Sequence, residues 1–151
     1  MQAKRGKYDR RMFTLHGVDP NVNPGCRAAA VRAYAAYLIP TDTLRPVGSS
    51  PSYHARRNGR GQGQGIDFGN VAGKRPGERG WATGRRRLVR FQAAEHARAR
   101  REAGRIERHD LVELIGPDNR LTILRGQETD LSEGTALETQ HDNHVHEAYA
   151  D

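Results

Sequence analysis

Apolar residues recur at intervals of three and four in two stretches of the chain, residues 27–38 and 86–103. In the first stretch the recurring positions are Val31, Tyr34, Ala35 and Leu38. In the second they are Leu88, Val89, Phe91, Ala94 and Ala97. Pro24 suits the start of the first helix and Pro40 closes it, while Gly104 suits the end of the second. The pattern predicts two helices whose buried sides carry these residues.

Shorter apolar or alternating runs predict strands. They lie at residues 66–68, 111–115, 121–124 and 144–149, with a further short extended piece at 43–46. The second and third runs are separated by Gly-Pro-Asp-Asn, which is typical of a hairpin. Glycine-rich residues 47–65 and 71–84 are expected to be loops. The sequence therefore predicts an α+β fold in which a small antiparallel sheet is flanked by two main helices.

The composition sets the size of the fold. The chain has 151 residues, of which 35% are hydrophobic, enough for one small core. We expect a flexible basic arm over residues 1–11 and a single domain over residues 12–151. No run approaches the roughly 18 apolar residues of a membrane span, and residues 1–11 lack the apolar centre of a secretion signal. The single cysteine, Cys26, excludes an internal disulfide and a cysteine-rich zinc site.

The charge is strongly positive, with 25 Lys and Arg against 18 Asp and Glu, a net charge of +7. Such a surplus favours polyanionic partners, although the arginines also serve simply to keep the surface soluble. Only 6% of the residues are aromatic, so the stacking that single-stranded nucleic acids need is sparse. Nucleic-acid binding is therefore not expected as the main role. An anionic cell wall or a virion partner suits the same charge.

A cluster of histidines lies near the end of the chain, where residues 141–146 read His-Asp-Asn-His-Val-His. On a strand, His144 and His146 share one face because side chains alternate. Two charged imidazoles side by side repel each other, and a bound cation removes this repulsion. The alternative is a chance cluster in a polar terminal segment.

An aspartate within an apolar run is the second chemical signal. Asp67 stands between Ile66 and Phe68, where burial is costly unless the carboxylate is paired or binds a metal. Together with His54, at the edge of the glycine-rich loop, and His146, it offers zinc two nitrogens and one oxygen. A fourth position then stays open for water, as in catalytic zinc sites.

The order of these motifs resembles a known group of enzymes. Ser52-x-His54, then Gly65-x-Asp67, then a late His144-x-His146 is similar to the zinc peptidases of the D-alanyl-D-alanine carboxypeptidase and murein endopeptidase group. That group shares its core fold with lysostaphin-like peptidases and hedgehog domains. The ending at residues 141–146 looks especially like the murein endopeptidase and phage-lysin version. The resemblance covers roughly residues 24–149.

The resemblance implies a role for each matching residue. His54, Asp67 and His146 match the three zinc ligands. His144 matches a residue beside the metal that assists catalysis, and His141 matches another active-site histidine. Arg45, in Leu-Arg-Pro, looks like an arginine that these enzymes carry shortly before the Ser-x-His motif. It would stabilise the charge of the transition state or hold a substrate carboxylate.

Two features depart from the pattern of the group. The carboxypeptidase branch places a glutamate base just before its final histidine, whereas Asp142 and Asn143 occupy that neighbourhood here. The general base is therefore either His144 or Asp142, with His144 favoured because imidazole titrates near neutrality. In addition, thirteen positions separate His54 from Asp67, more than is usual in the group. Such an insertion is tolerated because loop-closure entropy grows slowly with length, but a decayed site or a loop that contacts substrate are alternatives.

These expectations combine into a zinc-dependent peptidoglycan peptidase that cleaves a peptide bond in the stem peptide or the cross-link. We expect a phage lysin or a virion-associated enzyme, with virion tail or other phage proteins as further partners and no membrane partner. Without a signal peptide, it would stay in the host cytoplasm until release, or travel with the virion, and would act at the cell wall. The alternatives are a structural virion or assembly protein that retains the fold without activity, and a basic nucleic-acid-binding protein.

Overall fold

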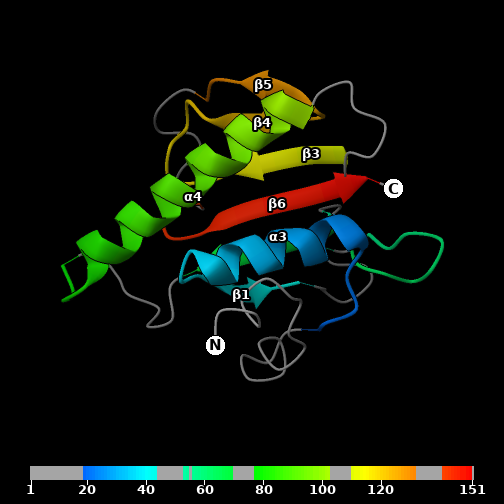
Figure 1. Ribbon diagram of the computed structural model, residues 1–151, viewed down its shortest axis with the longest axis horizontal. Helices are drawn as coiled ribbons and strands as arrows, with labels where there is room; N and C mark the ends of the chain where they lie inside the picture. The colour runs from blue at the N-terminus through cyan, green and yellow to red at the C-terminus, as the bar shows by residue number, and fades with distance from the viewer. Residues whose placement is uncertain are drawn as a thin grey trace.

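The computed structural model describes residues 19–43, 53–54, 56–69, 77–102, 110–131 and 141–150. Within them, six antiparallel strands form one sheet in the order β1-β2-β6-β3-β4-β5. The strands are β1 (Ile39–Asp42), β2 (Gly65–Gly69), β3 (Asp110–Ile115), β4 (Thr122–Leu124), β5 (Gln127–Thr129) and β6 (Val145–Ala150). Helices α3 (Pro24–Ala35) and α4 (Trp81–Glu102) lie side by side over one face of the sheet (Figure 1). The predicted α+β class is confirmed; the predicted arm, residues 1–11, lies outside the described residues.

Helix α3 begins where the sequence places its start. Asn23 caps it by accepting a hydrogen bond from the backbone N–H of Cys26 at 3.0 Å, and Pro24 occupies the first turn. The predicted buried side is wrong, because Tyr34 is exposed and the buried positions are Gly25, Cys26, Ala29, Ala30 and Ala33. These small residues let the helix backbone lie close to the sheet, which the larger Val31 and Tyr34 would prevent.

Helix α4 begins at Trp81, so the predicted loop over residues 71–84 is wrong at its end. Leu88 and Phe91 are buried as predicted, but Ala94 and Ala97 are exposed. Their places toward the sheet are taken by longer polar side chains: Gln92, Glu95, His96 and Arg98. These groups are buried because each finds a partner; the Gln92 amide, for example, donates to the carbonyls of Asp118 and Leu121 at 2.8 Å each.

Strands β2, β3, β4 and β6 lie where the sequence predicts them. The prediction for β1 is wrong, because α3 ends at Ala35 instead of Leu38 and Pro40 lies within the strand Ile39–Asp42, ahead of the extended piece expected at 43–46. The hairpin of β3 and β4 is confirmed, and β6 begins at Val145, one residue later than expected. β5 was not predicted, because its three residues are largely exposed and lack an apolar pattern. β6 lies between β2 and β3, so the end of the chain forms the centre of the sheet. Among the described residues, no helix is both long and apolar enough to cross a lipid bilayer.

An ionic network joins β6 to both helices. Arg32 of α3 donates two hydrogen bonds of 2.8 Å to the Glu95 carboxylate of α4. Arg98 donates to the Tyr149 hydroxyl at 2.9 Å, and that hydroxyl donates to Glu147 at 2.7 Å. Complete burial, together with the nearby negative charge of Glu95, raises the pKa of Glu147 well above its ordinary value. Three elements are therefore fixed to one another by polar contacts inside the core.

Gly25 provides a test of how closely α3 packs on the sheet. A Cβ atom at this position would lie 2.4 Å from Cγ of Tyr149, so Gly25→Ala must displace the helix or the ring. We expect a loss of about 1–3 kcal/mol in the free energy of unfolding, measured by urea denaturation. Gly59→Ala is the matched control, since a Cβ there meets nothing within 4 Å. Equal stability of the two variants would contradict this packing.

Candidate metal centre

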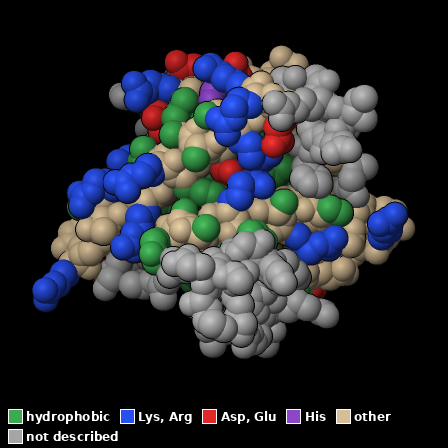
Figure 2. Space-filling model, in the orientation of Figure 1, with side chains coloured by type: hydrophobic (Ala, Val, Ile, Leu, Met, Phe, Trp, Pro, Cys, Tyr) green, Lys and Arg blue, Asp and Glu red, His purple; other side chains and the backbone are tan. Residues whose placement is uncertain are grey.

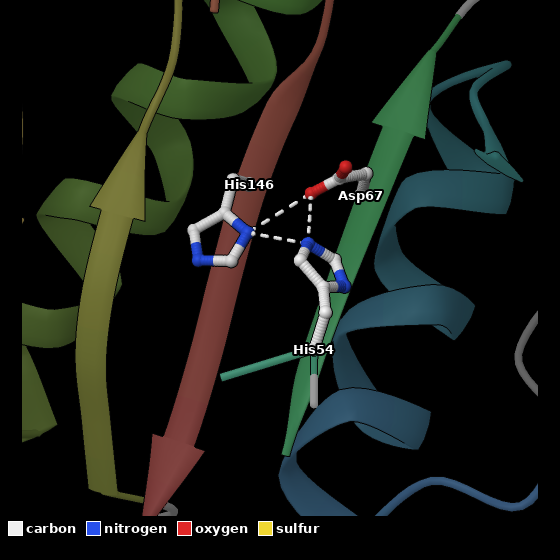
Figure 3. A group of neighbouring side chains, drawn as sticks. All are labelled: His54, Asp67 and His146. Carbon is white, nitrogen blue, oxygen red and sulfur yellow. Dashed lines mark hydrogen bonds and ion pairs between the residues drawn. The ribbon is translucent and has the colours of Figure 1, made fainter. Parts of the chain in front are cut away.

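Three buried side chains from separate parts of the chain converge on the sheet face opposite the helices (Figure 3). Asp67 Oδ1 lies 2.9 Å from His54 Nε2 and 2.9 Å from His146 Nδ1. The two nitrogens are 3.1 Å apart. All three residues are buried: the exposed fraction is 3% for His54, 6% for Asp67 and 4% for His146. The structure thus brings together the three residues that the sequence predicts as metal ligands, and the group can hold a metal ion.

Strand register and one close backbone approach create this arrangement. Asp67 and His146 are directly opposite each other in the β2–β6 pair, so their side chains emerge on the same face. His54 reaches them because its backbone lies against Gly65. A Cβ atom at Gly65 would come within 2.9 Å of the His54 backbone nitrogen, so only glycine fits there without a shift.

The outer nitrogen of each histidine is occupied. Nδ1 of His54 lies 2.8 Å from the carbonyl oxygen of Thr43, which can only accept a hydrogen bond. Nε2 of His146 lies 2.8 Å from the carboxylate of Glu113. Each ring therefore carries a proton on its outer nitrogen, and a neutral ring turns a lone pair inward. With both rings neutral, two nitrogen lone pairs and a carboxylate oxygen would face one another at short distance. Because these three acceptors repel one another, the arrangement needs either additional protons or a cation between them.

The close approach of these groups shifts the pKa values of Asp67 and His146 in opposite directions. Burial alone would raise the pKa of Asp67, but hydrogen bonds from His146 and His54 outweigh it and hold the pKa well below its usual range. Burial alone would lower the pKa of His146, but hydrogen bonds to Asp67 and Glu113 raise it to about 9. Without a metal, His146 is therefore a cation at neutral pH, and a proton occupies the place that a metal ion would take.

The separations between the three atoms suit a small divalent ion. Zinc at about 2.0–2.2 Å from each of three tetrahedral ligands would hold them roughly 3.3–3.6 Å apart. The observed separations, 2.9–3.1 Å, need to open by only a few tenths of an ångström. Imidazole nitrogens together with one carboxylate suit several divalent transition metals, so the donor set defines a metal centre without defining its ion.

The other predicted site residues differ in how close they lie to these three side chains. His144 precedes β6, and its Nε2 lies 3.7 Å from Asp67 Oδ2. Its Nδ1 lies 2.8 Å from the Asn143 amide oxygen, so the lone pair of a neutral ring is on Nε2. His141 packs against His144 with ring centroids 4.7 Å apart. Asp142 is exposed on the preceding turn, and Arg45 lies outside the described residues.

Glu113 is a site residue that the sequence analysis missed. It lies on β3 beside β6, and it holds the outer nitrogen of His146. The signal was present in the sequence, since Glu113 interrupts an apolar strand just as Asp67 does. No sequence motif includes Glu113, so the contact with His146 is what identifies it.

Comparisons with protein-family models, curated proteins and solved structures give no match to this chain.

The raised pKa of His146 predicts that stability falls with rising pH in the metal-free protein but changes little with pH in the metal-loaded form, in which the ring carries no such proton. In the metal-free protein, the contribution of His146 to stability is complete below pH 6.5. It is lost as pH rises toward 9, by at most about 1.4 kcal/mol per pH unit. Metal binding displaces this proton, so the apparent metal affinity rises up to about tenfold per unit over the same range. Thermal unfolding from pH 6.5 to 8.5, with a chelator and with a zinc buffer, measures both effects. Parallel curves would contradict this proton–metal competition.

Glu113 is expected to act as a positioning residue for the metal ligand His146. Glu113→Ala should raise the metal dissociation constant about 10–100-fold, the usual effect of losing such a partner. Glu113→Gln keeps an acceptor oxygen and should fall between the wild type and the alanine variant. Competition with a zinc-binding dye measures the affinities, and unfolding of the metal-free variants controls for folding. Wild-type affinity in Glu113→Ala would contradict the role.

Proposed function

We propose that this protein is a zinc-dependent peptidoglycan peptidase that cleaves a peptide bond in the stem peptide or the cross-link. The observation that carries the proposal is the convergence of three buried potential ligand atoms, from His54, Asp67 and His146, which lie 2.9–3.1 Å from one another. The order of the motifs, with Ser-x-His before the aspartate and a late His-x-His, adds support through its likeness to the zinc peptidases of murein. The setting is a phage lysin or a virion-associated enzyme.

A zinc ion held by these three residues supplies Lewis acidity and lowers the pKa of a bound water toward about 7. Burial is the largest influence on His144 and lowers the pKa of its ring, while the negative charge of Asp67 opposes this shift. His144 is therefore neutral at pH 7, and its unprotonated nitrogen is Nε2, which lies 3.7 Å from Asp67 Oδ2. This ring can accept a proton during attack on the peptide carbonyl and return it to the leaving amine.

His141, Asp142 and Arg45 are the remaining candidates for the catalytic site. His141 packs against the ring of His144 and limits the directions in which that ring can turn. Asp142 is the weaker candidate for general base, because it is exposed and its negative charge favours the charged form of His144. Arg45 is the proposed cation for a developing oxyanion or a substrate carboxylate.

Substitution of the two neighbouring histidines separates ligand from proton carrier. His146→Ala removes one of three protein ligands and should lose both zinc and activity. His144→Ala leaves all three ligands, so it should keep most of its zinc while turnover falls roughly 10²–10⁴-fold. Zinc content and hydrolysis of a soluble stem peptide are measured on both variants in parallel, with product masses identifying the bond that is cut.

Three outcomes would contradict this proposal in different ways. Loss of metal from His144→Ala but not from His146→Ala would mean that the ligand and the proton carrier are reversed. Stoichiometric zinc with no cleavage of any stem peptide would favour a structural virion protein with the same fold. Absence of zinc after incubation with the ion would remove the metal centre itself.

A further inference from the structure

The helix-covered face of the molecule carries a concentration of arginines. Arg85, Arg86, Arg87 and Arg90 of α4 are all exposed. Figure 2 shows Lys and Arg side chains along α4, with hydrophobic side chains between this helix and α3. This face is opposite the metal centre, since Phe68 and Tyr149 point toward the helices while Asp67 and His146 point away from them.

A groove of about 650 Å³ runs between the two helices within this face. Its floor is apolar and includes Ala36, Phe91 and Ala94, and its rim carries Arg87 and Arg90. A second hollow of about 610 Å³ follows the other side of α4, beside Arg85, Arg86 and Arg90. Arginines therefore border both hollows, and a chain laid across α4 would meet several of them.

Most of the positive charge of this face has no carboxylate partner in the described part of the chain; Arg85 alone of the four arginines acts on a described acid, Asp118. Arg86, Arg87 and Arg90 form no ion pair with a described carboxylate. The acid that lines the groove, Glu95, is 2% exposed, and its carboxylate is bound by Arg32 at 2.8 Å. Guanidinium groups without a carboxylate partner favour an external anion, and their planar fork matches phosphate oxygens.

We propose that this arginine face, defined by Arg85, Arg86, Arg87 and Arg90, binds the phosphodiester polymers of the cell wall. The inference rests on the proposed function, which places the protein at the wall. A linear polyanion fits the surface better than a small ion, because the arginines are spread over about 7.5 Å of helix at 1.5 Å per residue. Binding on this face leaves the opposite face, with the metal centre, open to peptide substrate.

Single-stranded nucleic acid is the competing polyanion, and the surface suits it less well. Such binding depends on aromatic faces on which bases stack. The guanidinium of Arg87 already lies over the ring of Tyr37, 5.5 Å from its centroid, and Trp81 is half-buried. A polymer of sugar or polyol phosphates needs contacts to phosphate but no stacking platform.

The test measures binding and cleavage separately. The chelator-treated full chain, which cannot use a metal, is titrated with soluble poly(glycerol phosphate) at several salt concentrations. The triple variant Arg86→Gln, Arg87→Gln, Arg90→Gln is compared with the control Arg100→Gln, Arg101→Gln, Arg125→Gln, which removes equal charge from exposed positions elsewhere. We expect the dissociation constant of the first variant to rise roughly tenfold or more, and its dependence on log salt to fall by about 2. The control should stay within about threefold of the wild type.

Cleavage of a soluble stem peptide by the zinc-loaded variants should be unchanged, so failure of the wall inference and failure of the peptidase proposal are distinguishable. Equal weakening in both triple variants would overturn the inference, because it would indicate net charge rather than this face. Tighter binding to a single-stranded oligonucleotide of equal phosphate content would also overturn it and assign the face to nucleic acid. Undiminished cosedimentation with sacculi stripped of their phosphodiester polymers would overturn it in favour of direct peptidoglycan binding.

Discussion

The register between β2 and β6 is the constraint on which the metal centre depends. It places Asp67 directly opposite His146, on the face away from the helices. Because side chains alternate along a strand, a slip of one residue would turn Asp67 or His146 toward the helices and replace it with an apolar or acidic neighbour. The chemistry of the site is therefore set by strand pairing before any contact with a metal.

The helix side of β6 fixes this register. Tyr149 packs on Gly25 and accepts a hydrogen bond from Arg98, and it donates one to Glu147. If the strand shifted by one residue, the imidazole of His146 would take the buried position of the Glu147 carboxyl group, which accepts a hydrogen bond from Tyr149. Buried ionic groups contribute little net stability, because desolvation offsets their attraction, but breaking one partner from another is strongly unfavourable. The ionic network therefore destabilises a shifted β2–β6 register more than it stabilises the native register.

Much of the fold was readable from the sequence, and the errors have physical reasons. Asp67 was identified because an acid inside an apolar strand needs a partner, and the same reasoning applied to Glu113 would have found the residue behind His146. The buried side of α3 could not be found from hydrophobicity, because an alanine-rich helix presents nearly equal apolar surface on several sides. What selects the side is the absence of bulk at Gly25 and Ala29, which depends on the distance to the sheet.

The thirteen positions between His54 and Asp67 show why distance along the chain is a weak guide to such a site. The intervening loop is tied down where it returns to β2. Gly63 bonds to Asn21 and Asn23 ahead of α3, and Gln64 accepts from the backbone of Tyr149 in β6. At the turn, the Asn58 side chain accepts from the backbone of Arg60 and Gln62. The loop is therefore an anchored excursion that returns the chain to β2. The distance from His54 Nε2 to Asp67 Oδ1 is fixed by the close approach at Gly65 and by the sheet rather than by the length of the loop.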